Sequence, residues 1–271
     1  MSRFELRTIS THDATRGVMP TLNKLRPGEA VIISKESPNL IDEVAYAHFT
    51  ENHAFSVGRE HSMHDVTFGD FAITAASGEQ LSRPSVAIKP YPKQWPWLAE
   101  HDFVISRRLD DATNQRMTYQ TIGFLRNHQA EIASITEFEQ GVQSCDNLLY
   151  GNRHEQATDE TVRLALTTAA KSLFILNNES LAHGDFFPRN TAIDHSLQPR
   201  IIDLTTITKA AKPDDFFRDI HDYARSVLQP DWGAPVAKAD LINLLLEPYL
   251  DAIPDILPAS ARKAVANQWA N

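Results

Sequence analysis

The residues between His183 and Asp203 combine two carboxylates and an amide at a spacing that suggests chemistry. Asp185 precedes Asn190 by five residues, and Asp203 follows Asn190 by thirteen, directly after Ile201 and Ile202. In phosphoryl transfer, one carboxylate accepts the proton of the attacking hydroxyl, while an amide and a second carboxylate offer hard oxygen ligands to Mg²⁺ on the nucleotide phosphates. The residue types therefore predict a phosphoryl-transfer site.

The spacing of the first part favours this interpretation over a purely structural turn. Residues 183–190, HGDFFPRN, match the pattern H-x-D-x-x-x-x-N, in which Asp acts as base and Asn binds metal. The same residue types are common in turns, and three fixed positions also recur by chance. However, the apolar pairs Leu181-Ala182 and Ile201-Ile202 predict short buried strands that end at motif residues. Catalytic loops are commonly set on a rigid scaffold in this way.

A lysine at the end of a predicted strand is the second candidate. Residues 86–89, VAIK, match the strand on which a Lys contacts the α- and β-phosphates and pairs with a helix Glu. Taken alone, such a Lys is more often a solvated surface residue. Glu100, on the helix expected to follow, is the natural partner of Lys89, although it is equally compatible with a plain surface acid. The sequence has neither G-x-G-x-x-G nor G-x-x-x-x-G-K-[ST], so it does not locate a loop that covers the phosphates.

Apolar periodicity predicts the elements that must position these residues. Strands are expected at 30–34, 68–77, 85–89, 121–125 and 132–138, and helices at 38–53, 97–109, 144–149, 158–176, 214–228, 237–250 and 259–269. Thr158 or Asp159 is expected to cap the helix that begins there. The order indicates an α+β protein with two lobes, a β-rich N-terminal lobe over 1–138 and a helical C-terminal lobe over 139–271. A cleft between two such lobes is a usual place for a nucleotide.

Composition narrows the class of protein further. The chain has 271 residues, a formal net charge of -9 and one cysteine, Cys145. No apolar run approaches the roughly 18 residues of a membrane-spanning helix, and the first residues lack the apolar core of a signal peptide. We therefore expect a cytoplasmic protein that binds neither membrane nor nucleic acid, since nucleic-acid binding favours basic surfaces. The negative net charge is compatible with a cationic small substrate. His61 and His64 lack nearby Cys, which argues against a zinc site.

At these motifs the chain resembles the kinase-like phosphotransferases, especially the aminoglycoside phosphotransferase and choline kinase group. HGDFFPRN is similar to that group's H-G-D-x-x-P-x-N loop. Ile201-Ile202-Asp203 is similar to its I-D metal motif, which replaces the D-F-G of protein kinases. Residues 136–149, TEFEQGVQSCDNLL, resemble its hinge and first C-lobe helix. The resemblance runs from about residue 86 to residue 228 and implies a two-lobed, protein-kinase-like fold.

The resemblance also implies roles for the matching positions in the catalytic loop. Asp185 would be the catalytic base, and His183 would brace the loop. Asn190 and Asp203 would hold Mg²⁺.

Other matching positions would bind the nucleotide, ATP. Lys89 would contact its phosphates, with Glu100 as the partner of Lys89. Backbone groups near Phe138 and Glu139 would hold the adenine.

The resemblance leaves two points open. Either Asp219 or Asp222 would match the structural Asp that braces the catalytic loop. Arg189 departs from the frequent Gly of the antibiotic enzymes, which leaves the acceptor undetermined.

The leading functional hypothesis is an ATP- and Mg²⁺-dependent kinase that phosphorylates a hydroxyl of a small molecule, such as an aminoglycoside, an amino alcohol or a sugar-like compound. A protein kinase is a second hypothesis, which the missing Gly-rich loop, D-F-G and A-P-E segments disfavour. A third is a nucleotide-binding interaction module without turnover.

Overall fold

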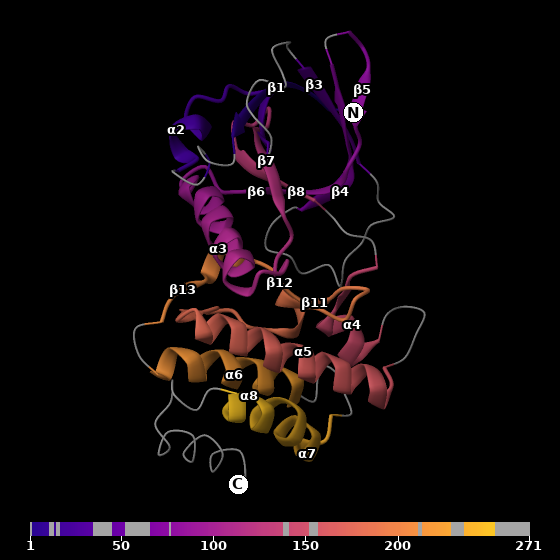
Figure 1. Ribbon diagram of the computed structural model, residues 1–271, viewed down its shortest axis with the longest axis vertical. Coiled ribbons are helices and arrows are strands. Elements are labelled where there is room, and N and C mark those ends of the chain that lie inside the picture. Colours follow the sequence, from indigo (N-terminus) through magenta and orange to yellow (C-terminus); the bar gives the residue numbers. More distant parts are fainter. Residues whose placement is uncertain are drawn as a thin grey trace. The chain divides into compact units, whose positions relative to one another are not determined.

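A computed structural model of the chain describes residues 2–10, 14, 17–34, 45–51, 66–75, 77–137, 141–151, 157–210, 213–228 and 236–252 (Figure 1). The chain divides into two compact units. The first comprises residues 1–107 and 119–140, and the second comprises residues 108–118 and 141–271. No helix within the described ranges is both long and apolar enough to cross a membrane.

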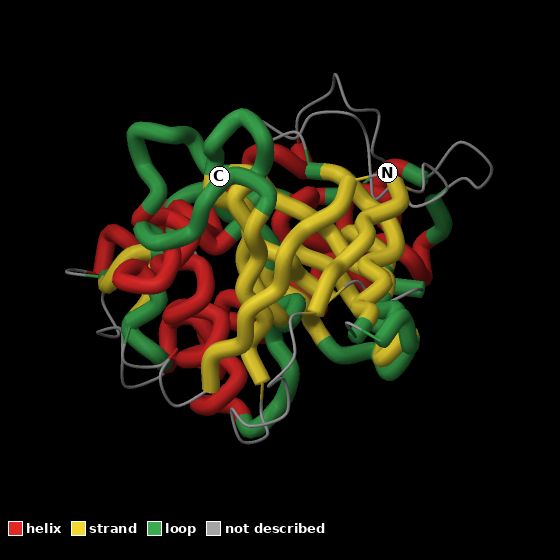
Figure 2. Tube along the Cα trace, turned by 90° about the horizontal axis from the view of Figure 1, so that it is seen from above, coloured by secondary structure: helices red, strands yellow, loops and turns green. Residues whose placement is uncertain are grey.

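The first unit is built on a sheet that closes on itself. Its strands, yellow in Figure 2, are β1 (Ser2–Ser10), β2 (Glu29–Ser34), β3 (Ala45–Glu51), β4 (Thr67–Thr74), β5 (Gln80–Ser82), β6 (Ser85–Pro90), β7 (Thr121–Arg126) and β8 (Ile132–Glu137). Their order is β3-β1-β2-β7-β8-β6-β4-β5, and an additional pairing of β3 with β4 closes the ring, with β5 attached to β4. The β1–β2 pair is parallel, and the other pairs are antiparallel.

Apolar side chains fill one face of this closed sheet. One buried cluster consists of Phe4, Leu6, Ala30, Ala47, Phe49, Phe71, Val86, Ile88, Leu125, Ala133 and Ile135. Members on the same strand stand two positions apart, as on β1, β3, β6 and β8, because successive side chains of a strand point to opposite faces. In a small barrel such residues fill the interior, so this unit has a packed core.

Two glycines permit close contacts between neighbouring strands. A Cβ atom at Gly69 on β4 would lie 2.2 Å from the carbonyl oxygen of Thr50 on β3, and one at Gly123 on β7 would lie 2.4 Å from that of Val31 on β2. Real Cβ atoms do not approach oxygen so closely. Glycine is therefore required where these strands come together.

Two helices pack on the other face of this sheet. They are α2 (Met19–Leu22) and the first part of α3 (Trp97–Thr113). A second buried cluster joins them to β2, β7 and β8, and its members are Ala14, Val18, Leu22, Leu25, Val31, Tyr91, Ala99, Phe103, Phe124 and Ile132.

The second unit is mainly helical. Its helices are α4 (Cys145–Tyr150), α5 (Asp159–Asn178), α6 (Pro213–Leu228), α7 (Lys238–Leu241), the π-helical turn η5 (Ile242–Leu246) and α8 (Glu247–Ala252). Its short strands are β9 (Gln143–Ser144), β10 (Leu181–Ala182), β11 (Thr191–Ile193), β12 (Pro199–Ile201) and β13 (Thr208–Lys209). Two 3₁₀ turns, η2 (Pro188–Asn190) and η3 (Leu204–Thr206), complete the loops.

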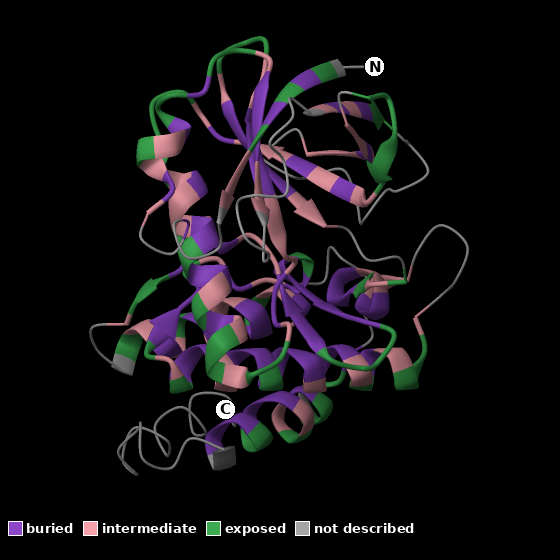
Figure 3. Ribbon diagram, turned by 45° about the horizontal axis from the view of Figure 1, so that its top comes forward, coloured by how far each residue is buried: buried purple, intermediate pink, exposed green. Residues whose placement is uncertain are grey.

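Helix α5 forms the centre of this unit, and its buried residues recur at helical spacing (Figure 3). Thr158 caps it: the Thr158 hydroxyl accepts the N–H of Thr161, while the Thr161 hydroxyl accepts the N–H of Thr158. This reciprocal arrangement satisfies backbone donors that the first turn leaves without partners.

Most predicted elements are confirmed, including the mixed α+β class, α3, α5, α6 and the strands around Lys89. The helix predicted over 38–53 is wrong at 45–51, where β3 lies; the rest of that range and the helix at 259–269 fall outside the described residues. Ala47 and Phe49 are buried while Tyr46 and His48 are less so, which is the two-residue period of a strand. Strand β1 and the closure of the barrel were not predicted. The two-lobed, protein-kinase-like arrangement stays a prediction.

Candidate active site

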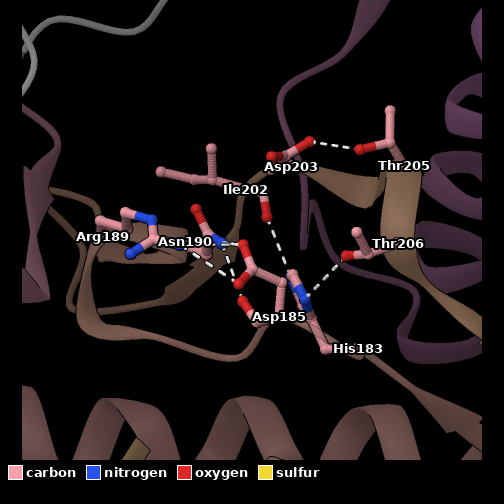
Figure 4. Close-up of polar contacts among 8 residues, drawn as sticks. All are labelled: His183, Asp185, Arg189, Asn190, Ile202, Asp203, Thr205 and Thr206. Carbon is pink, nitrogen blue, oxygen red and sulfur yellow. Dashed lines mark hydrogen bonds and ion pairs between the residues drawn. The ribbon is translucent and has the colours of Figure 1, made fainter. Parts of the chain in front are cut away.

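A short hairpin in the second unit brings the distant members of the candidate site together. Strands β11 and β12 pair antiparallel with Thr191 opposite Ile201. Beyond this pair, the N–H of Ile202 donates to the carbonyl oxygen of Asn190 at 2.9 Å. Asn190 and Asp203 therefore lie at the same end of the hairpin although they are thirteen positions apart in the sequence (Figure 4).

The Asp185 carboxylate is held by the two residues that end the loop. The Asn190 side-chain N–H₂ donates to Asp185 Oδ2 at 2.9 Å and to the Asp185 carbonyl oxygen at 2.8 Å. The Arg189 Nη2 lies 3.1 Å from Oδ2 and 3.2 Å from Oδ1 (Figure 4). The Asp185 side chain stays 27% exposed. It is thus an oriented carboxylate that a solvent-borne hydroxyl can reach, as a general base requires.

Asn190 and Asp203 have the chemistry of a magnesium site. Because the Asn190 nitrogen is bound to Asp185, its Oδ1 faces elsewhere and has no hydrogen bond to any part of the chain that the structure describes. Asp203 has φ 54° and ψ 72°, a left-handed conformation that Asp tolerates better than most residues, and its Oδ1 accepts the hydroxyl of Thr205 at 2.7 Å. The described residues contain no group of three or more His, Cys, Asp or Glu fit for a metal. An amide oxygen with one carboxylate nevertheless suits Mg²⁺, which takes one or two protein ligands together with water and phosphate oxygens.

His183 is a buried brace between the loop and the hairpin. Its Nε2 lies 3.0 Å from the carbonyl oxygen of Ile202, so Nε2 donates, and its Nδ1 lies 3.4 Å from the Thr206 hydroxyl. Burial lowers the pKa of His183 below 6.5; the bond to Ile202 and the charges of Asp203 and Asp185 raise it by less. A neutral ring that donates to the residue before Asp203 orients that residue and is not itself set to transfer protons.

Asp219 on α6 holds the start of the loop. Its carboxylate accepts the N–H of His183 at 2.5 Å and that of Gly184 at 2.8 Å. Burial raises the pKa of Asp219 from 3.8 to about 6, although both amides oppose this shift. Gly184 has φ 77°, where other residues are strained. Of the two candidates that the sequence left open, Asp219 is therefore the brace, while Asp222 lies 3.7 Å from the His221 ring.

Lys89 on β6 of the first unit pairs with Asp102, which was not among the expected residues. The Lys89 ammonium lies 3.1 Å from Asp102 Oδ2, and the two side chains are 16% and 10% exposed. The Tyr91 hydroxyl donates to the same oxygen at 2.8 Å and lies 3.2 Å from the Ser134 hydroxyl. A buried polar network thus fixes the ammonium, because each member has a partner.

The expected pairing of Glu100 with Lys89 is wrong. Glu100 Oε1 instead accepts the N–H groups of Val18 at 2.8 Å and Met19 at 3.3 Å, where α2 begins. Positions 100 and 102 lie about 200° apart around a helix, so the two side chains point in different directions. Asp102 shares the buried face of α3 with Ala99 and Ser106, and this periodicity is the sequence signal that would have identified it.

Phe138 and Glu139, expected to hold the adenine, lie outside the described residues.

Comparison with known proteins assigns the chain to no family. No protein-family model matches the sequence, and no curated protein sequence matches it. Among solved structures, "WaaP in complex with acyl carrier protein" is similar over 80% of this chain and 90% of that chain, with 14% sequence identity and a TM-score of 0.47. A similarity at this level transfers neither family nor activity to the chain.

Proposed function

We propose that the chain is an ATP- and Mg²⁺-dependent phosphotransferase that moves the γ-phosphate to a hydroxyl of a small molecule. One observation carries the proposal: Asn190 binds the Asp185 carboxylate through its nitrogen and keeps its oxygen available, at the hairpin end that also bears Asp203. In a purely structural turn there is no reason for the Asn190 nitrogen to bind Asp185 while its oxygen is left without a hydrogen bond to the described residues.

The chemistry follows from these positions. The acceptor hydroxyl gives its proton to Asp185, and its oxygen bonds the γ-phosphorus of ATP as the bond from that phosphorus to the bridging oxygen breaks. The products are the phosphorylated acceptor and ADP, and the proton leaves Asp185 to solvent. Asn190 and Asp203 would hold Mg²⁺, which when bound neutralises charge on the phosphates. The loop itself contributes orientation, since phosphoryl transfer is catalysed mainly by positioning and electrostatics.

The remaining assignments belong to the same proposal. Lys89, oriented by Asp102, would contact phosphate oxygens of the nucleotide. His183 and Asp219 act through the loop and are positioning residues.

A kinetic comparison of Asp185→Asn with the natural chain tests the proposal. ADP formation is followed with Mg²⁺ and ATP, alone and with a panel of hydroxyl acceptors, and ATP affinity is measured by calorimetry. We expect kcat to fall by about 10²–10⁴-fold, as for loss of a general base, with ATP affinity little changed. Asp222→Asn is the matched control, because it removes one carboxylate of the same unit that, within the described residues, has no hydrogen bond or ion pair with the loop.

Three outcomes separate the candidate functions. Undiminished turnover in Asp185→Asn removes Asp185 from the mechanism. ATP binding without ADP formation in the natural chain indicates a nucleotide-binding module. Transfer to proteins in preference to small molecules indicates a protein kinase.

A further inference from the structure

Arg189 places a cation directly against the proposed base. Its Nη2 contacts both oxygens of Asp185, and its Cζ lies 4.6 Å from the centre of the Phe187 ring. In Figure 4 the guanidinium lies beside the carboxylate, on the side away from His183. The ring and the carboxylate together define where the cation sits.

This ion pair is not needed to hold the loop. Asn190 already binds Asp185 through two hydrogen bonds and is buried, whereas the Arg189 side chain is 49% exposed. Exposed ion pairs contribute little to stability, because water screens them and long side chains lose rotamer freedom. A role in binding therefore explains the arginine better than a role in folding.

The guanidinium retains donors for a ligand. Within the described part of the chain its hydrogen bonds go to Asp185 alone, through Nη2, so Nε and Nη1 have no protein partner there. These N–H groups form the planar fork that binds carboxylates and phosphates through two parallel bonds. A hydroxyl that reaches Asp185 thus lies next to a site for an anion.

We propose that Arg189 determines acceptor specificity by binding an anionic group of the acceptor, so that the substrates are hydroxyl compounds that carry a carboxylate or a phosphate. This inference rests on the proposed function and narrows its substrate class. A cationic acceptor, such as an aminoglycoside or an amino alcohol, would bring its charge close to the guanidinium and be repelled. The overall charge of -9 does not decide which acceptors bind, because salt screens distant surface charges more than it screens charges beside the acceptor.

Sets of matched acceptors test the inference whatever the natural substrate is. Each charged member keeps the carbon skeleton of its neutral counterpart and all but one of its free hydroxyl groups. The sets are galacturonate, galactose and galactosamine; glucose 6-phosphate, glucose and glucosamine; glycerate, glycerol and serinol. ADP formation is measured for the full chain with Mg²⁺ and ATP, after subtraction of the Asp185→Asn background. We expect kcat/KM to be at least about tenfold higher for anionic than for neutral members, and lowest for cationic members.

Substitution of the arginine should change this ranking. Arg189→Gln should lower the anionic-to-neutral ratio by about tenfold, mainly through KM, and Arg189→Lys should recover part of it, because a point charge replaces the fork. Arg163→Gln is the control: it removes an exposed arginine of α5, and the ratio should not change. A preference for neutral or cationic members, or a ratio that Arg189→Gln leaves unchanged, overturns the inference.

A binding measurement decides the case in which none of these compounds is turned over. The Nε–H signal of Arg189, assigned by its loss in Arg189→Gln, is followed by NMR while each compound is added. A saturable shift with galacturonate, glucose 6-phosphate or glycerate, and none with their neutral counterparts, supports the inference; no shift with any anion refutes it. The proposed function is tested separately from this charge preference. It fails if no ADP is formed, or if ADP formation does not depend on Asp185.

Discussion

Two acidic residues of α3, Glu100 and Asp102, make different contacts within the first unit. Asp102 neutralises Lys89, and Glu100 binds the backbone where α2 begins. The sequence pointed to Glu100 alone as the partner of the lysine. Their directions around the helix distinguish them, and those directions depend on which face of α3 is buried.

Asp102→Asn and Glu100→Gln should therefore differ in their effect on nucleotide binding. Loss of the Asp102 charge removes the carboxylate that lies 3.1 Å from a largely buried ammonium, and we expect about 3 kcal/mol lower stability together with a raised KM for ATP. Glu100→Gln removes the same charge from the same helix but weakens only backbone hydrogen bonds, so about 1 kcal/mol of stability should be lost with KM unchanged. Urea unfolding and steady-state kinetics measure both. Equal changes in KM would show that Asp102 does not position Lys89.

The sequence predicted which nearby residues lie together better than it predicted contacts between residues far apart in the chain. Asp185, Asn190 and Asp203 lie close together because a local loop and hairpin join them, and their roles stay predictions. The contact of Glu100 with Val18 spans 82 positions and has no local signal. The ion pair of Arg189 with Asp185 spans only four positions, but nothing in the residue types showed that the arginine turns back to the loop.

The β11–β12 hairpin is the element on which the metal site depends. Its turn is held by Asp194, which accepts the N–H groups of Ser196 at 2.8 Å and Gln198 at 2.9 Å. Asp194 also pairs with Arg200 at 2.5 Å, and both side chains are buried. Arg200 further donates to the carbonyl oxygen of Arg116.

Asp194→Asn should destabilise the chain and weaken the metal site together. An asparagine keeps an oxygen for the turn but removes the charge that lies 2.5 Å from the buried Arg200, so we expect a loss of about 3 kcal/mol. Mg²⁺-dependent ATP affinity should fall as well, because Asn190 and Asp203 flank the hairpin. Urea unfolding and calorimetry provide the measurements.

The double variant Asp194→Asn with Arg200→Met serves as the control. Removal of the second charge should recover part of the lost stability, because a buried guanidinium that has lost the Asp194 charge costs more than an apolar side chain. A double variant less stable than the sum of the two single changes would argue that charge pairing is not what holds the hairpin.

Elements with strong periodicity were predictable, and those defined by distant partners were not. Helix α5 combines a long apolar face with a capping threonine, and both signals are local. The spacing of Val44, Ala45 and Phe49 also fits a helical period, so the sequence pattern predicts a helix where β3 lies. Its strand conformation depends on pairing with β1 and β4 on either side.

For each unit taken as a whole, the closed sheet is the feature that no local pattern shows. The β3–β4 pairing closes the ring, and β1, which begins it, was not recognised as a strand. The apolar patterns at 30–34, 68–77, 85–89, 121–125 and 132–138 predicted a β-rich N-terminal part. Whether a sheet closes depends on which strands pair with one another, and a short stretch of sequence does not show that pairing.

Two buried groups link the stability of the whole molecule to pH in opposite directions. The pKa of Asp219 is raised to about 6, so between that value and 3.8 the native chain holds a proton that the unfolded chain has lost. The contribution of Asp219 to stability therefore increases as the pH falls through 6. The pKa of His183 is lowered, so below 6.5 the unfolded chain takes up a proton first, and stability decreases as the pH falls.

A comparison of the natural chain with Asp219→Asn separates the two effects. The free energy of unfolding is measured in urea at several values from about pH 7.5 to about pH 5. His183 is present in both proteins, so its titration largely cancels in the difference between them. We expect that difference to grow in favour of the natural chain by about 1 kcal/mol as the pH falls, because only the aspartate takes up a proton. A constant difference for Asp219→Asn would mean that the buried carboxylate keeps its charge throughout, held by the amides of His183 and Gly184.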